Sequence, residues 1–263
     1  LYMAVNYLNN KDMLAEIHRS KSTYCSFVSE EDKEYDLILP SVDKINIRTV
    51  AEAKRERAKR LSKLTNETVN PKTVNKHDVV FRIMTFDHIP NSNRKTKPKT
   101  VADSKAKCNF PPFQHWRYNE QDELICVGKS HWRDGLSNGR FSTDHGKMTT
   151  KLAKMFLLLT QRYGTRGNWR GYTYNDEMQG QALMQLSQIG LQFDESKSDN
   201  PFAYYTAAIT NSFTRILNVE KKNQSLRDDI LQENGMTPSH TRQMEWEIQQ
   251  RKEREIDSKN KNF

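Results

Sequence analysis

The feature that most constrains the fold is a run of three segments, between Lys147 and Lys222, in which apolar residues recur every three or four positions. This spacing places the apolar side chains on one face of an α-helix. The first segment, "KMTTKLAKMFLLLTQRYG", ends at Gly164, and the third, "NPFAYYTAAITNSFTRIL", begins with Asn200 as a cap and Pro201 at the first helical position. The sequence therefore predicts three main helices that form one compact unit over residues 149–222. We expect its core to contain Leu152, Phe156, Leu159, Leu183, Leu186, Phe202, Ile209 and Phe213.

The rest of the chain differs in character from these three segments. Residues 1–75 are predicted to be a helical, basic and peripheral segment. Residues 76–146 contain "DVVFRIMTF" and "ELICVGKSHW", whose β-branched and aromatic residues predict strands in a small β-rich module. Residues 223–263 are predicted to form charged helices and a tail. The expected fold class is thus mainly α, with a helical domain over residues 147–222 that follows a small β-containing N-terminal module.

Composition limits the environment and the partners of the chain. The net charge of +9 favours a polyanionic partner, most simply nucleic acid. Cys25, Cys108 and Cys126 are odd in number and lack C-x-x-C spacing, which indicates a reducing compartment. No apolar run approaches the roughly 20 residues of a membrane span. We therefore expect a cytoplasmic protein with no membrane partner.

Residues 149–222 resemble region 2 of a bacterial RNA polymerase sigma factor. The resemblance rests on the leucine-rich first helix that leads to a Tyr and an Arg-Gly turn, and on the acidic, Gly-containing second helix that ends in Phe193-Asp194. It also rests on the third helix, which begins with Phe202, Tyr204 and Tyr205 and runs through "FTRIL" to "EKK". These features are most similar to those of the late-transcription sigma factors of T-even-like and cyanobacterial phages.

The resemblance implies a function and partners. Such a factor binds the host RNA polymerase core, and recognises and melts the -10-like element of phage late promoters in the cytoplasm of an infected bacterial cell. The second helix docks on the coiled coil of the polymerase's largest subunit in this family. The matching residues here are Asp176, Glu177, Gln179, Gln181 and Gln185. The resemblance implies no enzymatic activity, no cofactor and no metal.

The chain also departs from the family pattern. Ala207 and Ala208 replace the paired tryptophans that often follow the melting-helix tyrosine, so melting is expected to depend on Tyr204, Tyr205 and Trp169. No region 4 is recognisable in the sequence. Related phage factors reach a sliding clamp through an apolar and acidic C-terminal tail, whereas "IDSKNKNF" is basic, so binding to a clamp or to a phage co-activator is an expectation of the family alone.

The residues themselves support contact with DNA on physical grounds. Phe202, Tyr205 and Ile209 share one face of the third helix, which is expected to be core, while Tyr204 lies beside that face. An accessible aromatic ring stacks on an unpaired base for roughly 1–3 kcal/mol. The candidates for contact with base edges are Thr210, Asn211, Thr214 and Arg215. The candidates for contact with phosphates are Arg166, Arg170, Lys221 and Lys222, together with Lys95, Lys97 and Lys99 of the middle loop.

Three alternatives stay open at the level of sequence. "TFDHIP" resembles the Asp-His-Ile core of HNH nucleases, in which Asn109 and His115 would supply further metal-site residues beside His88. Cys108, His115, Cys126 and His131 would be the ligands of a zinc site, although their spacing departs from the usual short loops. The third alternative is a DNA-binding protein that makes no contact with polymerase.

Overall fold

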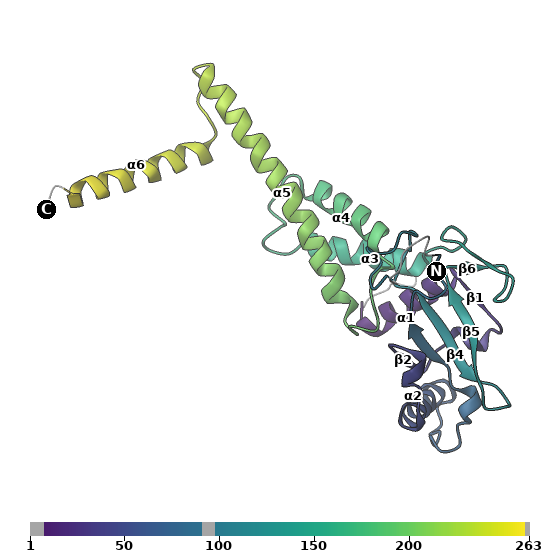
Figure 1. Cartoon of the computed structure of the whole chain (residues 1–263). Helices are drawn as coiled ribbons and strands as arrows, with labels where there is room; N and C mark the ends of the chain where they lie inside the picture. The colour runs from purple at the N-terminus through teal and green to yellow at the C-terminus, as the bar shows by residue number, and fades with distance from the viewer. Residues whose placement is uncertain (1–7, 91–97, 261–263) are drawn as a thin grey trace, which may run out of the picture.

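The computed structural model describes residues 8–90 and 98–260 and divides into an N-terminal region built on a sheet and a mostly helical C-terminal half (Figure 1). Helices take up 50% of the described residues and strands 11%, so the fold is mixed α/β. The expectation of a mainly α chain therefore holds for the C-terminal half and needs correction for the N-terminal region. Within the described residues, no helix is long and apolar enough to cross a membrane.

The N-terminal sheet has five strands in the order β1-β5-β4-β3-β2. All neighbours pair antiparallel except β2 and β3, which are parallel. The strands are β1 (Cys25–Phe27), β2 (Leu37–Leu39), β3 (Phe81–Met84), β4 (Phe113–Tyr118) and β5 (Leu124–Ser130). A separate small ribbon pairs β6 (Trp132–Arg133) with β7 (Arg140–Phe141). The predicted strands in "DVVFRIMTF" and "ELICVGKSHW" are confirmed as β3 and β5.

Two strands of this sheet come from the first 75 residues, which we expected to be helical. β1 and β2 are three residues long and lie at the two edges of the sheet, where each pairs with a strand distant in sequence. Strands this short carry too little alternation to be recognised locally. The α-helices in the described part of the segment are α1 (Asn10–Ser22), capped by Asn9, and α2 (Ile47–Thr65), capped by Asn46. A small apolar cluster that includes Ala53, Ala58 and Phe81 packs α2 against the sheet.

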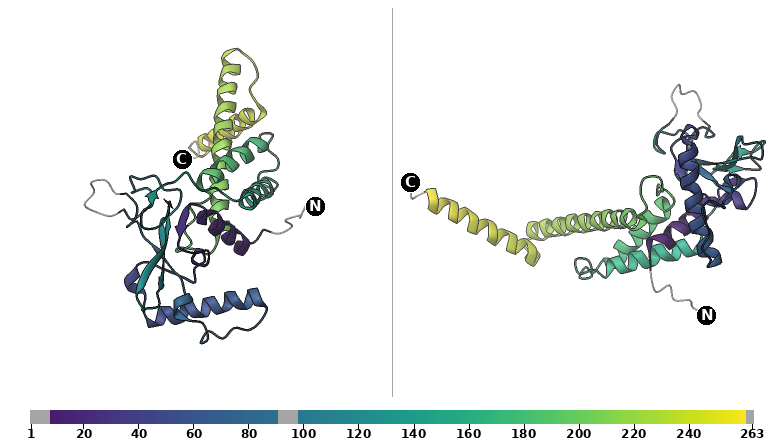
Figure 2. Two further views of the ribbon diagram at one scale, coloured as in Figure 1. Left: turned by 90° about the vertical axis from the view of Figure 1, so that its right-hand side faces the viewer. Right: turned by 90° about the horizontal axis from the view of Figure 1, so that it is seen from below.

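Helix α1 is not peripheral, because it lies between the sheet and helices α3 and α5 (Figure 2). Its Met13 and Ile17 side chains are fully buried in the same apolar cluster as the helical half. The N-terminal region and the helical half therefore share a core.

The helical half contains the three predicted helices. They are α3 (Thr150–Gly164), α4 (Asn175–Ile189) and α5 (Pro201–Glu233), and no strand lies within the described stretch 150–217. Thr149 caps α3, and Asn200 caps α5 by accepting a hydrogen bond from the Ala203 amide. Six of the predicted core residues are buried, while Leu183 and Phe202 are partly buried and pack against the others. The predicted apolar core is thus confirmed.

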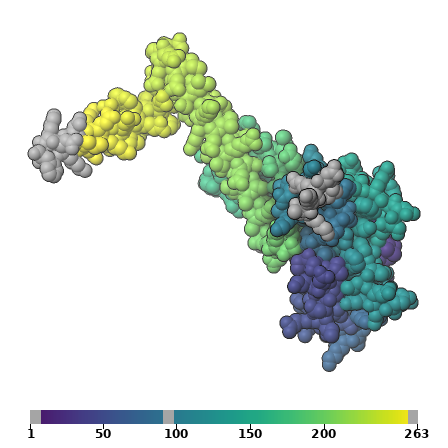
Figure 3. Space-filling model, in the orientation of Figure 1, coloured from purple at the N-terminus to yellow at the C-terminus, as the bar shows by residue number. Residues whose placement is uncertain are grey.

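Helix α5 continues well past Lys222, where we expected it to end. It runs as one helix of 33 residues because no Gly or Pro interrupts the sequence from Phe202 to Glu233. Its distal part and α6 (His240–Asn260) form an arm that projects from the body (Figure 3). The bend between them is held by Asp228, whose carboxylate accepts hydrogen bonds from the Ser239 amide at 2.8 Å and hydroxyl at 2.7 Å.

Candidate nucleic-acid interface

One face of α5 belongs to the core. Tyr205, Ile209 and Phe213 are fully buried. The Tyr205 hydroxyl donates to the Gly190 carbonyl at 2.6 Å, and its ring lies 4.7 Å from that of Phe156 in an edge-on contact. Burial raises the pKa of this phenol. The expectation that Tyr205 contacts a base is corrected here, because its ring is inaccessible while the helix is packed.

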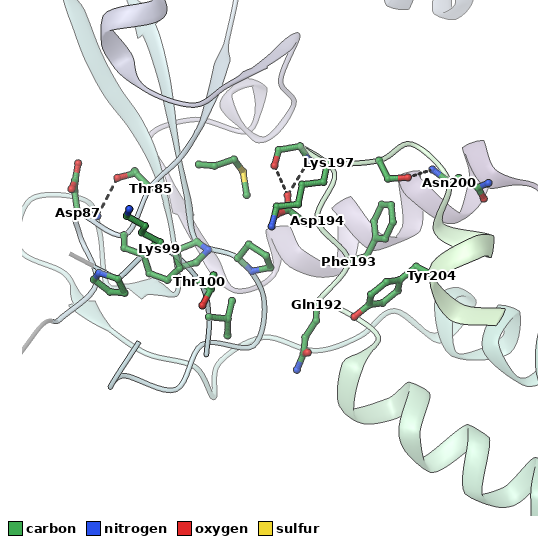
Figure 4. Close-up of a pocket in the computed structure, with 18 of the residues that line it drawn as sticks. Thr85, Asp87, Lys99, Thr100, Gln192, Phe193, Asp194, Lys197, Asn200 and Tyr204 are labelled. Atoms are coloured by element: carbon green, nitrogen blue, oxygen red, sulfur yellow. Dashed lines mark hydrogen bonds and ion pairs between the residues drawn. The ribbon is translucent and has the colours of Figure 1, made fainter. Parts of the chain in front are cut away.

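Tyr204, in contrast, is half-buried and lies at the edge of a hollow of about 680 Å³ (Figure 4). Its ring packs edge-on against Phe193 at 5.6 Å and against Tyr205 at 5.2 Å. Phe193 itself is buried and belongs to the loop between α4 and α5. The two rings form one wall of the hollow. The Tyr204 ring is therefore held by its contact with Phe193 and is still accessible to solvent.

The opposite wall of the hollow comes from the N-terminal region. It is lined by residues 84–87 at the end of β3, by residues 98–101, and by Pro111 and Pro112 before β4. Lys99 reaches it from this side, and Lys197, paired with Asp194 at 3.4 Å, reaches it from the other. Lys95 and Lys97 lie outside the described residues. The aromatic wall is suited to stacking on a planar base, and the cations at the edge are suited to a phosphate, although Asp87 and Asp194 also line the hollow.

The predicted base-edge candidates divide into two groups. Asn211, Thr214 and Arg215 are exposed, and they line a shallow groove along α5 together with Asn218, Val219 and Lys222. Thr210 instead points inward, where its hydroxyl bonds to the Tyr163 hydroxyl and donates to the Thr206 carbonyl. Thr210 is therefore a packing residue in this structure, which corrects its expected role.

The loop after α3 carries the predicted cations and one buried ring. Trp169 is only 7% exposed, and its ring meets that of Phe213 edge-on at 5.3 Å. It therefore supports the core of α5 and is not accessible to a base, contrary to expectation. Arg166 is exposed and stacks over the Tyr163 ring at 4.2 Å, and Arg170 is exposed beside it. Lys221 and Lys222 are also exposed, further along α5.

The residues expected to contact polymerase fall on two sides of α4. Asp176 and Glu177 are exposed in its first turn. Gln179 donates to the Asn175 side chain at 2.5 Å. Gln181 and Gln185 are half-buried and line a hollow between α4 and α5 that also contains Asn211 and Arg215. Two of the residues expected to contact polymerase thus lie beside two of those expected to contact DNA. Sequence spacing does not reveal this proximity.

The residues of the nuclease and zinc alternatives make hydrogen bonds within the N-terminal region, where the backbone amide of Asn109 donates to His131 at 3.2 Å. His88 accepts from the Gln114 amide at 3.1 Å and contacts the Ser130 carbonyl at 2.9 Å, while His115 contacts Arg82 and the Asp32 carbonyl. Burial raises the pKa of the Cys108 thiol to about 11 and also raises that of Cys126. Across residues 8–90 and 98–260, no three His, Cys, Asp or Glu side chains converge to hold a metal ion. The geometry gives neither alternative support.

Sequence reasoning missed two features of the site. Phe193 and the N-terminal wall of the hollow were not recognised, because their approach to Tyr204 depends on the packing of distant segments. The side chains of Lys21, Arg82 and Glu195 are buried next to the loop between α4 and α5. Their burial was not predicted, because charged residues give no periodic apolar signal. Comparisons of the chain with protein-family models, with curated proteins and with solved structures found no match.

Proposed function

We propose that this chain is a sigma-type transcription initiation factor, which binds RNA polymerase core through α4 and captures an unpaired promoter base on Tyr204. The observation that carries the proposal is the position of Tyr204, supported by Phe193 and open to a hollow of about 680 Å³. Stacking on one accessible ring contributes roughly 1–3 kcal/mol. That free energy is of the size needed to hold one base out of the duplex stack.

The rest of the exposed face of α5 suits adjacent duplex DNA. Tyr204, Asn211 and Asn218 are spaced by seven residues and therefore lie along one side of the helix. From Tyr204 to Lys222 this side is about 27 Å long, at 1.5 Å per residue. Asn211 and Arg215 are suited to base edges, and Lys221 and Lys222 are suited to phosphates. Base capture, base reading and phosphate contact would thus follow one another along a single helix.

Docking on polymerase is assigned to the first turn of α4. Asp176 and Glu177 are exposed there, and acidic side chains attract a basic partner surface through electrostatic steering. Because this docking surface lies beside α5, polymerase core bound to it would hold α5 against the promoter. We therefore expect specific initiation with core and weak or no specific promoter binding by the isolated chain.

The proposal is tested by reversing the charges of that turn. The double variant Asp176→Lys/Glu177→Lys should capture host polymerase core at least about tenfold more weakly than the unaltered chain, with an unchanged circular dichroism spectrum. The matched control is Glu245→Lys/Glu247→Lys, an exposed acidic pair on α6. Normal core binding by the α4 variant would show that the docking assignment is wrong. If the unaltered chain fails to bind core but binds DNA, it is a DNA-binding protein without polymerase contact.

A further inference from the structure

A buried charge cluster joins the loop between α4 and α5 to the N-terminal region. We define it as Lys21 of α1, Arg82 of β3 and Glu195 of the loop. The Lys21 ammonium lies 2.6 Å from one Glu195 oxygen, and the Arg82 guanidinium lies 4.0 Å from the other. The three side chains are 1%, 0% and 6% exposed, so solvent does not screen their attraction.

The N-terminal region fixes the position of Arg82 from several directions. Its guanidinium lies between the rings of Tyr35 and Phe113, at 3.9 Å and 3.8 Å. Its Nε donates to His115 at 3.0 Å, and its Nη2 lies 2.9 Å from the His18 ring. Arg82 therefore has little freedom to move. Glu195 and the loop between α4 and α5 must lie where they can pair with Arg82 and Lys21.

Glu195 carries charge at this buried position. Burial alone would raise the pKa of its carboxyl, but the Lys21 and Arg82 charges outweigh that effect and hold the pKa below its usual value. Ion pairs of this kind cost desolvation and are often no more stabilising than apolar side chains of similar size. Such a cluster does impose a placement, because each buried charge is compensated only while its partners lie beside it.

One residue, Phe193, connects the buried charge cluster to Tyr204. Lys21 also donates to the Phe193 carbonyl at 2.6 Å, two residues before Glu195. The Phe193 ring then supports Tyr204 at 5.6 Å. We propose that the buried charge cluster positions the Phe193–Tyr204 wall, with Glu195 as a positioning residue through which the N-terminal region takes part in base capture. This inference rests on the function proposed above.

The first test measures position without DNA. In the full chain, Glu195→Gln should accelerate amide hydrogen exchange in residues 190–204 by about tenfold or more, while exchange in α3 is unchanged. Glu195→Asp, which keeps the charge but shortens the side chain, should give an intermediate rate. Asp199→Asn is the matched control, since Asp199 is exposed in the same loop. Unchanged exchange in residues 190–204, or an equal rise throughout the chain, would overturn the proposal.

The second test is a double-mutant cycle on the opening of duplex promoter by the chain bound to polymerase core. Glu195→Gln should slow opening by about threefold to tenfold, and should have no further effect in the Tyr204→Ala background. An equal additional slowing in that background would mean that the cluster supports the fold alone, and would overturn the positioning role. If Tyr204→Ala itself has no effect, the proposed function fails, and the exchange measurement still decides whether the cluster positions the wall.

Discussion

The part of the core among α3, α4 and α5 is built mainly from apolar side chains, whereas the interior of the sheet region also buries charged and ionisable ones. Leu152, Phe156 and Phe213 are representative of the first, with at most 1% of their surface exposed. Arg82, His115 and His131 are representative of the second, and all three are fully buried. Both regions exclude water, but the second must also satisfy hydrogen bonds and charges.

This difference separates the ways in which the two regions respond to change. Apolar packing depends on volume and is insensitive to pH, so the core among α3, α4 and α5 should lose stability mainly when side chains are removed. The sheet region holds ionisable groups away from water, so it should also lose stability when their protonation changes. The largest expected effects therefore come from a cavity in one region and from pH in the other.

The first prediction concerns the apolar region. Phe213→Ala should lower the free energy of unfolding by about 3–5 kcal/mol, because it removes a fully buried ring that contacts Tyr163 and Trp169. Chemical denaturation should give the same loss at pH 7 and at pH 5. Thr214→Ala, at the adjacent exposed position, is the control and should change stability by no more than about 0.5 kcal/mol. A loss that grows as pH falls would contradict the separation of the two regions.

The second prediction concerns pH and the sheet region. Burial lowers the pKa of His88 from 6.5 to about 4, against the opposing effect of the Ser130 carbonyl. Between these two values the unfolded chain binds a proton that the folded chain excludes, so stability falls as pH falls through this window. A shift of this size corresponds to about 3 kcal/mol when the window has been fully crossed.

The variant His88→Gln isolates that contribution. Gln cannot take up the proton, and its amide can still donate to the Ser130 carbonyl. Urea denaturation between pH 7 and pH 5 should therefore show a smaller loss of stability for the variant than for the unaltered chain. His131 retains its own dependence, because burial lowers its pKa to about 3. Identical slopes for the two proteins would show that His88 is not held neutral by burial.

The same difference explains how far the sequence predicts the fold. The three-to-four spacing of Leu152, Phe156 and Leu159 is a local signal, so the helices and most of their core were predictable. The edge strands β1 and β2 were not, because their pairing depends on distant segments. Arg82 and Lys21 were not recognised as buried, because a charged residue is normally read as surface. The burial of apolar residues can be predicted from their spacing along the chain. The burial of charged residues depends on partners that are brought together only in the folded structure.

The candidate site divides in the same manner. The start of α5 follows from Asn200 and Pro201, and the separation of Tyr204 from the core face follows from helical spacing. Both agree with the structure. The spacing could not show that Thr210 would bond to Tyr163, or that Trp169 would pack against Phe213. Nor could it show that a wall from the N-terminal region would face Tyr204.

The measurement that tests the central claim most directly is the rate at which Tyr204→Ala, bound to polymerase core, opens a duplex promoter. We predict a rate about ten- to a hundredfold lower than that of the unaltered chain, which corresponds to the loss of one base-stacking contact of roughly 1–3 kcal/mol. A promoter with a premelted bubble should restore initiation, because its bases are already unpaired. A Tyr204→Ala variant with an unchanged melting temperature that opens duplex promoter at the full rate would contradict the claim, and would leave Tyr204 as a packing residue only.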